Sequence, residues 1–520
     1  MTEEASSKST AQLLGDRRNK LKRLRDEFGL DPYGHATPGI VSLAEAKSRY
    51  DGAADQAHKD NPDVDDRPIV KVSGRVVHHR PMGNLIFLVL RDHTGDLQVA
   101  VSKKVVGQPY FGLAKMTDYG DLVVASGPLA KTKTGEITVW AEPAPGNADG
   151  DPPYAIATKS LALPPGKHHG LTDPETRYRK RYVDLYANPE VMRTMQLRIR
   201  IIDEIRDYLR GRGFMEVETP MLQSLHGGAA ARPFHTHHNA LGIPLTLRIA
   251  PELYLKRLLV GGFPKVFEIN RNFRNEGVSP RHNPEFTMLE AYEAFGNWET
   301  MAELVEDMTC TVAEKLFGTL KIEHRNAEEE VTKTINLTRP WRRVSMVDLV
   351  EERTGWKFTK APATQEQIDQ LREKNPGKGL KFDGTPAEQL VEVFEKLIEH
   401  TLIDPCFVTH VPSVIIPLAK KNVQDPYFAD VYELAINGVE ISPGYTELND
   451  PEVQEANFRE QVGDEEEQQQ IDEDFLEALR VGMPPAGGLG LGIDRLVMML
   501  TGAESIRDVI LFPLMRPQGG

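Results

Sequence analysis

Cysteine is scarce in this chain. Two cysteines, Cys310 and Cys406, occur in 520 residues, far apart and without the spacing of metal ligands. This excludes a disulfide framework and is typical of a reducing cytosol. The opening residues, MTEEASSKST, have no apolar core of a signal peptide, and no apolar run approaches the ~20 residues that cross a bilayer. We therefore expect a soluble, cytoplasmic protein without a membrane partner.

Two common nucleotide-binding loops are also missing. The sequence contains neither G-x-G-x-x-G nor G-x-x-x-x-G-K-[ST]. Basic residues are not in excess either, because the net charge is −15. That charge argues against wholesale coating by nucleic acid but allows a local basic track. Three histidines, His235, His237 and His238, suggest a metal site, but no further Cys or His cluster completes one, so we do not predict it.

The length predicts two or more domains in a globular protein. Residues 1–15 are predicted to be a disordered tail. Residues 16–67 are predicted to be a helical region followed by a linker that is rich in Asp, Ala and Pro. The basic side chains of the first helix either are solvated or contact an RNA backbone, and the pattern leaves both interpretations open.

Residues 68–165 predict a small β-barrel. Five short β-type runs are separated by turn signals, and residues 111–118 are compatible with a helix before the fourth run. This is the plan of an OB-fold, which binds oligonucleotides. An exposed Phe87 beside Arg80 and Gln98 would stack one base and bond its edges. A core Phe87 fits the spacing equally well. The Pro- and Gly-rich residues 143–170 are predicted to be a hinge.

Residues 166–520 predict a second, larger domain. It would start with a long amphipathic helix whose apolar residues are Met195, Ile199, Ile202, Ile205 and Leu209. A strand with the sequence FMEVETP follows it. Residues 345–408 contain two or three amphipathic helices with a polar interruption, and we interpret them as a helical insertion.

An antiparallel hairpin is predicted from Phe267 to Phe295, with a turn rich in Gly, Ser and Pro. Period-two counting places Phe286, Met288, Glu290 and Tyr292 on one face of its second strand. Such a face is a poor core surface, because unpaired buried charge is costly. It suits a ligand with a planar ring, a phosphate and a cation.

The last informative stretches are VYELAINGVEISPGYTELND and GGLGLGIDRLVMML. The first reads as paired strands in which Glu433, Glu440 and Glu447 repeat every seven residues. The second predicts a strand that is apolar on one face and bare on the other, so that a flat ring can lie against its backbone. Asp494 is predicted to cap the following helix, which also carries Arg495.

These motifs resemble those of the class II aminoacyl-tRNA synthetases, most closely the lysyl branch. The hairpin resembles motif 2, the Gly-rich strand and helix resemble motif 3, and the helix followed by GF-x-EV-x-TP resembles motif 1. The resemblance covers about residues 16–516. It implies an α+β protein: an N-terminal OB-fold β-barrel that binds the anticodon, then a catalytic domain with an antiparallel sheet flanked by helices. It also implies a homodimer whose interface includes Pro220.

The resemblance assigns roles in the activation of an amino acid by ATP. The catalytic residues would be Arg274 at the α-phosphate, Arg495 at the γ-phosphate end and His282 near the triphosphate. Mg²⁺ would be the cofactor, held by Glu433 and Glu440. The implied ATP-binding residues are Arg274, Glu276, His282, Asn283, Phe286 and Arg495.

Lysine recognition is implied in the same way. Glu290 and Glu447 match the acids that pair with the side-chain ammonium, with Tyr292 beside them, while Glu252 and Gly228 would meet the α-amino group and Arg274 the carboxylate. The implied anticodon-binding residues are Arg80, Phe87, Gln98 and Glu136.

Two departures from the family pattern lie near these acids. The family commonly has E-I-G-N-G-F-S-E, whereas this chain has Pro443 in place of the Asn and Tyr445 in place of the Phe. Proline removes a side-chain amide and a backbone N–H. Ile416 also stands where a Ser is usual.

The expected function is that of a lysine–tRNA ligase, with ATP, L-lysine and tRNA(Lys) as substrates. An aspartyl- or asparaginyl-type enzyme is the nearest alternative, but it predicts a cation in the pocket where this hairpin offers Glu290. A non-catalytic, synthetase-like RNA-binding protein is a second alternative. It should have lost Arg274, Arg495 or the metal-binding acids, and all are present.

Overall fold

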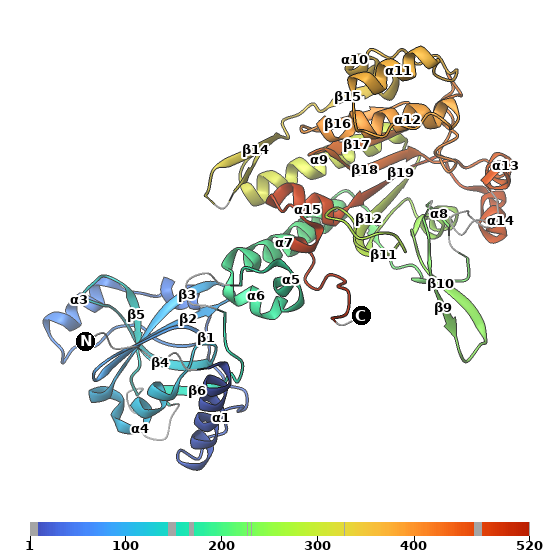
Figure 1. The fold of residues 1–520 in the computed structure, drawn as a ribbon. Coiled ribbons are helices and arrows are strands. Elements are labelled where there is room, and N and C mark those ends of the chain that lie inside the picture. The colour runs from blue at the N-terminus through green and yellow to red at the C-terminus, as the bar shows by residue number, and fades with distance from the viewer. Residues whose placement is uncertain are drawn as a thin grey trace. The chain divides into compact units, whose positions relative to one another are not determined.

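A computed structural model describes residues 9–143, 152–165, 171–225, 227–229, 231–326, 328–461 and 471–518 (Figure 1). The chain forms two compact units that divide between Arg193 and Thr194. The fold is α+β, as predicted. The predicted domain limit between residues 165 and 166 stays a prediction. Among the described residues, no helix is both long and apolar enough to span a bilayer.

The N-terminal unit contains the predicted barrel. Its described strands have the order β1-β2-β3-β5-β4-β6, and a further pairing of β1 with β4 closes the barrel. A longer helix than expected, α4 (Lys103–Met116), lies between the third and fourth strands. The strands are β1 (Ile69–Met82), β2 (Leu85–Asp92), β3 (Gly95–Ser102), β4 (Leu122–Lys131), β5 (Ile137–Trp140) and β6 (Tyr154–Thr158).

Strand β6 corrects the prediction of a hinge over residues 143–170. Its Tyr154 and Ile156 are buried in the barrel core, and the strand pairs with β4. Residues 144–151 and 166–170 of the predicted hinge lie outside the described residues. Burial of two alternate apolar side chains outweighs the turn signals that flank them.

The prediction of disorder over residues 1–15 is wrong from Ser9 onward, because helix α1 spans Thr10–Asp26. Ser9 and Gln12 form a capping box at its start. Residues 1–8 lie outside the described part. Two further helices follow, α2 (Leu43–Ser48) and α3 (Gly52–Asp60). Helix α3 corrects the predicted linker, since Asp51 caps it and the buried Asp55 accepts a hydrogen bond from the Lys131 backbone.

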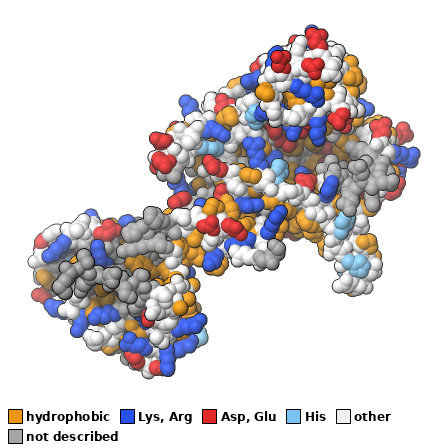
Figure 2. Space-filling model, in the orientation of Figure 1, with side chains coloured by type: hydrophobic (Ala, Val, Ile, Leu, Met, Phe, Trp, Pro, Cys, Tyr) orange, Lys and Arg blue, Asp and Glu red, His pale blue; other side chains and the backbone are white. Residues whose placement is uncertain are grey.

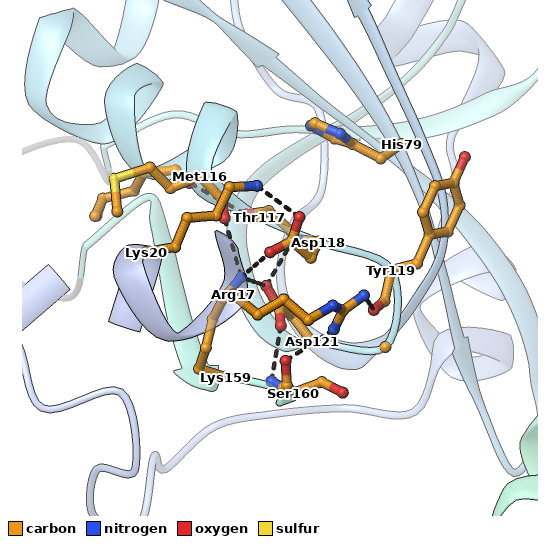
Figure 3. A network of polar contacts seen from close by, with 12 residues as sticks. Arg17, Lys20, His79, Met116, Thr117, Asp118, Tyr119, Asp121, Lys159 and Ser160 are labelled. Carbon is orange, nitrogen blue, oxygen red and sulfur yellow. Dashed lines mark hydrogen bonds and ion pairs between the residues drawn. The ribbon is translucent and has the colours of Figure 1, made fainter. Parts of the chain in front are cut away.

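Buried charges join α1 to the barrel (Figure 3). Lys159 Nζ, which is fully buried, lies 2.6 Å from Asp118 Oδ2 and 2.7 Å from Asp121 Oδ2. From α1, Lys20 Nζ lies 2.5 Å from Asp118 Oδ1, and the Arg17 guanidinium donates to the carbonyls of Tyr119 and Ser160. Part of the basic character of α1 therefore serves the fold itself.

The second unit is built on a large mixed sheet. Its described strands have the order β15-β16-β17-β18-β19-β12-β11-β7, antiparallel except for the pairs β15–β16 and β11–β7. The predicted hairpin is confirmed as β11 and β12. The strands are β7 (Met215–Glu216), β11 (Lys265–Phe273), β12 (Glu285–Ala294), β15 (Arg342–Ser345), β16 (Cys406–Thr409), β17 (Val431–Ile436), β18 (Val439–Thr446) and β19 (Ala486–Gly492).

Three helices cover one face of this sheet: α7 (Pro189–Gly211), α9 (Trp298–Phe317) and α15 (Ile493–Thr501). Leu289 and Ala291 of β12 point into this core, so the alternate residues of the strand point to the opposite face. Helix α7 confirms the predicted amphipathic helix. Ile199, which the spacing placed on the same apolar stripe as Ile205, differs from it in burial. The surface of Ile199 is 57% exposed, whereas Ile205 is fully buried.

The opposite face is covered at its two ends. At one end lie α10 (Met346–Thr354), α11 (Gln365–Lys374) and α12 (Pro386–Leu397), which confirm the helices of the predicted insertion. Its predicted end at residue 408 is wrong, because β16 belongs to the main sheet. At the other end lie α8 (Glu252–Val260) and α14 (Glu473–Gly482). The middle of this face is left for a cavity.

Shorter elements complete the chain. A three-stranded sheet has the order β8-β10-β9 in the described residues, and β13 pairs with β14. Helices α5 and α6 belong to the N-terminal unit. The bounds are α5 (Pro174–Arg179), α6 (Arg181–Ala187), β8 (Leu222–Gln223), β9 (Phe234–His238), β10 (Ile243–Leu247), β13 (Lys321–Arg325), β14 (Val331–Asn336), α13 (Pro451–Gln461) and α16 (Ile506–Val509).

Candidate active site

A cavity of about 390 Å³ lies on the uncovered face of the main sheet. Its walls come from the β11–β12 hairpin, from β18 and β19, from the start of α15 and from residues 415–418. The structure brings together almost all residues that the sequence predicted for this unit. Those that line the cavity are Gly228, Glu252, Arg274, Glu276, His282, Asn283, Phe286, Glu290, Tyr292, Glu440, Glu447 and Arg495.

One end of the cavity is acidic. Glu252, Glu290 and Glu447 are all buried there, and Tyr292 donates a 3.0 Å hydrogen bond to Glu290 Oε2. Behind them lies Lys256, whose Nζ is 2.7 Å from Glu252 Oε1 and 2.5 Å from Glu447 Oε2. Lys256 therefore pairs with two of the three acids, and Glu290 has no resident ammonium partner in the described residues, so this end of the cavity suits a cationic ligand.

This crowding changes the ionisation of the acids. Burial, with Glu252 nearby, raises the pKa of Glu290 to about 8. Burial also raises the pKa of Glu447 to about 8, although Lys256 acts in the opposite direction. Although burial by itself lowers the pKa of Lys256, its two acidic partners raise it overall. The empty site is thus strained by like charge, and a cation would relieve that strain.

The other end of the cavity is cationic. The Arg274 guanidinium lies over the Phe286 ring, 5.2 Å from its centroid. Arg495 donates to the Glu440 carbonyl at 2.8 Å and lies 3.2 Å from His282 Nε2. Burial and the neighbouring Arg495 lower the pKa of His282, so the neutral ring accepts this hydrogen bond. Two fixed guanidiniums facing one space suit a phosphate-rich ligand.

Asp494 positions the start of α15 in a way that the sequence did not predict. The predicted N-cap role is wrong, because Gly492 occupies that position. Instead, Asp494 is buried, forms an ion pair with Arg198 of α7, and accepts a 2.8 Å hydrogen bond from the Thr287 backbone. The backbone that carries Arg495 is therefore anchored, through Asp494, to both α7 and β12.

The two acids predicted for a metal lie on paired strands, Glu433 on β17 and Glu440 on β18. Glu440 lines the cavity, whereas Glu433 is not among the lining residues. Burial and mutual repulsion raise the pKa of Glu433 well above its usual range, and burial raises that of Glu440. No cluster of three or more His, Cys, Asp or Glu with metal-binding geometry occurs in the described residues. Carboxylate oxygens are suitable ligands for Mg²⁺, but two of them are fewer than the ion takes, so an ion here would need further oxygen ligands.

The space beside the glycines of β19 differs from one glycine to the next. A Cβ on Gly488 would lie 2.0 Å from Glu447 Oε1, and one on Gly490 would lie 2.5 Å from the Met288 methyl group. Side chains therefore already cover the bare face at these positions, and the prediction of a flat ring against the backbone is wrong there. At Gly492 the nearest atom would be 3.6 Å away, so space remains beside Arg495.

The departures from the family pattern lie in the cavity wall. Pro443 and Ile416 both line it, together with Ile415 and Leu418, and give it apolar side chains as well as the acids. Gly228 also lines it, with φ +88° and with Cβ atoms of Ala250 and Glu252 3.2 Å from where its own would be. A larger residue at this position would be strained.

The barrel residues predicted to bind RNA lie on its outer face. Phe87 is partly exposed, while its neighbours Ile86 and Leu88 are fully buried, so the alternative of a core phenylalanine is wrong. The Arg80 guanidinium lies 5.5 Å from the Phe87 ring centroid, and the Trp140 ring meets that ring edge-on at 6.3 Å. Gln98 donates to Thr138 Oγ1 at 2.9 Å.

The remaining predicted residues are exposed. Glu136 is exposed in the turn between β4 and β5, and Pro220 is exposed after β7. His235, His237 and His238 are exposed on β9, and Figure 2 shows histidine side chains on this protruding hairpin. In the described part of the chain they belong to no group of three or more possible metal ligands.

Sequence reasoning missed Lys256, Asp494's anchoring role and Trp140. Lys256 could have been found, because it stands four residues after Glu252 on a predicted helix, where opposite charges pair. Trp140 could have been found as an aromatic residue on the strand after the Glu136 turn. The Arg198–Asp494 pair carries no local signal, because 296 positions separate the two residues.

Comparison with known proteins agrees with this geometry. Residues 173–516 match the family model of "tRNA synthetases class II (D, K and N)", and residues 70–142 match the "OB-fold nucleic acid binding domain" model. A lysine–tRNA ligase of Pelotomaculum thermopropionicum is 45% identical, over 98% of this chain and 95% of its own. Lysine–tRNA ligases of Carboxydothermus hydrogenoformans and Staphylococcus epidermidis are each 44% identical, over 98% and 96% of this chain and 98% and 97% of their own. The chain therefore belongs to the class II tRNA synthetase family of the D, K and N group.

Proposed function

We propose that this chain is a lysine–tRNA ligase. It activates L-lysine with ATP to lysyl-adenylate and pyrophosphate, and then transfers lysine to the 3′ end of tRNA(Lys). The observation that carries this proposal is the division of one cavity into an acidic end, with Glu252, Glu290 and Glu447, and a cationic end, with Arg274 and Arg495. The names of the relatives support the same activity.

In the first step, a lysine carboxylate oxygen attacks the α-phosphorus, and the bond to the pyrophosphate oxygen breaks. The proposed role of Arg274 is to hold the α-phosphate and the carboxylate, since the transition state is dense in phosphate charge. Arg495 would grip the γ-phosphate end, with the neutral His282 beside it. Glu276, Asn283 and Phe286 would complete the ATP site, with the adenine on the Phe286 ring.

Mg²⁺ is the proposed cofactor, held by Glu433 and Glu440. When bound, it would neutralise phosphate charge and fix the bend of the triphosphate. The observation in its favour is the raised pKa of both carboxyl groups, which burial and proximity cause. A divalent cation would allow both to ionise.

Lysine recognition rests on complementary charge. Glu290 and Glu447 would pair with the side-chain ammonium, with the Tyr292 hydroxyl positioned by its bond to Glu290. Glu252 and the backbone at Gly228 would receive the α-amino group. The apolar wall with Pro443 and Ile416 would face the methylene chain of the substrate.

The second step needs tRNA. A hydroxyl oxygen of the terminal ribose attacks the lysyl carbonyl carbon, and AMP leaves. On the barrel, Phe87 is proposed to stack an anticodon base, while Arg80, Gln98 and Glu136 contact its neighbours. A cytoplasmic location is proposed from the substrates.

A homodimer is also proposed, with Pro220 at its interface. Large apolar side chains are exposed on the segment that leads to and follows this proline: Ile199 at 57%, Met215 at 39% and Leu222 at 51%. Exposed apolar surface of this kind marks protein contacts.

Aspartate or asparagine specificity is not favoured. A carboxylate or amide substrate would face the acids Glu252, Glu290 and Glu447, and the Lys256 ammonium group is already paired with two of them. The non-catalytic alternative is also not favoured, because the guanidiniums of Arg274 and Arg495 are both in the cavity.

Amino-acid-dependent ATP–pyrophosphate exchange tests the proposal, with the twenty amino acids and ornithine supplied separately. Exchange with lysine alone is expected, and it should stop when EDTA removes Mg²⁺ and return when Mg²⁺ is restored. Exchange with another amino acid would assign the specificity differently, and no exchange by folded protein with Mg²⁺ would reject the activity.

A further inference from the structure

We propose that Lys256 is a positioning residue for substrate lysine: its ammonium group holds Glu252 and Glu447 in place and favours the charged form of Glu447, so that the acidic end attracts a ligand with two ammonium groups. This inference rests on the proposed function and extends it to a residue outside the cavity.

Three oxygen atoms surround the Lys256 ammonium group. Its Nζ lies 2.7 Å from Glu252 Oε1, 2.5 Å from Glu447 Oε2 and 3.3 Å from the Leu418 carbonyl. Glu252 and the Leu418 carbonyl accept hydrogen bonds from it, whereas the Glu447 carboxylate is an ion-pair partner whose oxygens have no hydrogen bond in the described residues. The side chain is fully buried. Lys256 thus links α8, the residue after β18 and the loop that carries the apolar wall.

Lys256 does not reach the substrate space. Glu252, Glu447 and Leu418 line the cavity, and Lys256 is not among the described residues that do so. Any effect on the substrate must therefore pass through these acids.

The charges at this end of the cavity explain why such a residue is needed. Glu252, Glu290 and Glu447 bring three negative charges when ionised, and Lys256 brings one positive charge. The remaining two negative charges equal the two ammonium groups of lysine, while Arg274 is left for the carboxylate. Arg248, the other buried cation nearby, is already engaged by Glu268 at 2.7 Å.

Removing Lys256 would leave three buried carboxylates without a resident cation. Like charges in a buried site take up protons rather than remain ionised. A protonated Glu447 attracts an ammonium group weakly. The Lys256 ammonium therefore affects binding of lysine but has no corresponding effect at the phosphate end.

The test uses full-length Lys256→Met, which keeps an unbranched stem and removes the charge, with Lys256→Gln as a second variant. Lys265→Met is the matched control, because Lys265 forms a 2.6 Å ion pair with Glu293 on the β11–β12 hairpin and does not line the cavity. In ATP–pyrophosphate exchange, KM for lysine should rise at least about tenfold in both Lys256 variants. KM for ATP should stay within about twofold. The acidic limb of kcat/KM for lysine should move to higher pH.

An unchanged KM for lysine in a folded variant, or an equal rise of both KM values, would overturn the proposal. Wild-type protein without lysine-dependent exchange would reject the proposed function instead, so the two failures are distinguishable. Folding is checked by circular dichroism and by thermal unfolding.

Calorimetry of L-lysine binding to wild-type protein decides the matter if neither variant folds. Titrations at about pH 7.5 in buffers of different ionisation enthalpy give the number of protons released. Because burial raises the pKa of both Glu290 and Glu447 to about 8, binding should release about two protons or fewer, from these two acids. Release of about three would mean that a further acid beside Lys256 is protonated in the empty site, which would overturn the proposal.

Discussion

At the scale of single residues, the environment of a side chain decides its role in the cavity. Arg274 lies over Phe286, and its Nε has no hydrogen-bond partner in the described part of the structure. A guanidinium with an unpaired N–H beside an open cavity can bind an anion. Glu290 is only 5% exposed and lies near another acid, so it can bind a cation.

Replacing Arg274 by Ala should lower kcat of lysine-dependent pyrophosphate exchange by roughly 10²-fold or more, because transition-state charge loses a fixed partner. Arg271→Ala is the control, since Arg271 is partly exposed on the same strand, β11, does not line the cavity, and lies 3.7 Å from Glu285. A near-wild-type rate in Arg274→Ala would reject the proposed role.

Replacing Glu290 by Gln should change how stability depends on pH. The folded protein keeps the Glu290 proton until the pH reaches its pKa of about 8, whereas the unfolded chain releases it near 4.5. The unfolded state thus binds fewer protons in this window, and stability falls as pH rises through it. At about pH 8 and without lysine, the variant should unfold about 2 °C or more above the wild type, and the difference should vanish near pH 5.

Lysine itself provides the control for this measurement. It should raise the unfolding temperature of the wild type, because binding favours the folded state, and should do so far less for Glu290→Gln. A variant that is less stable than the wild type at pH 8 would contradict the assigned cause of the pKa shift.

At the scale of elements, strand β2 has one face in the barrel core and one face on the barrel surface. Ile86, Leu88 and Leu90 fill the barrel core, and Phe87 with Val89 lies on the outer face. Arg80 on the paired position of β1 and Trp140 on β5 extend this face. An aromatic pair with a guanidinium is a stacking surface for bases.

Replacing Phe87 by Ala should weaken tRNA binding by about 1–3 kcal/mol while leaving tRNA-independent pyrophosphate exchange intact. Val89→Ala, on the same outer face of β2, is the control and should affect neither measurement. Equal losses in tRNA binding and exchange would indicate a folding defect rather than lost stacking.

At the scale of the whole molecule, the two units divide the proposed reaction between them. The barrel unit offers a surface for RNA, and the unit with the large sheet offers a cavity for ATP and lysine. Figure 2 shows acidic and basic side chains interspersed over the visible face, and the net charge of the whole chain is −15.

The proposed homodimer can be tested by measuring the mass of the protein in solution. Sedimentation equilibrium should give roughly twice the 58.2 kDa of one chain, because exposed apolar residues favour association. Ile199→Asp should shift the mass toward that of one chain. Val423→Asp, at a position with 92% exposure in the same unit, should leave the mass unchanged. A monomeric wild type would reject the dimer.

Local patterns determined much of this protein. The alternation in β11 and β12 predicted which residues face the cavity, because a strand has a period of two residues. The turn signals and five β-type runs predicted the barrel. The residues proposed for ATP and lysine were identified by resemblance, and the structure brings them into one cavity.

Tertiary structure decided what depends on contacts between distant segments. Whether Phe87 is core or surface, whether Gly488 leaves its face bare, and whether Asp494 caps a helix or anchors it were each decided by neighbours far away in the chain. The ion triad of Glu252, Lys256 and Glu447 likewise needs α8 and the end of β18 to meet. A sequence pattern encodes the period and polarity of one element, but burial and the pairing of charges arise only when elements pack together.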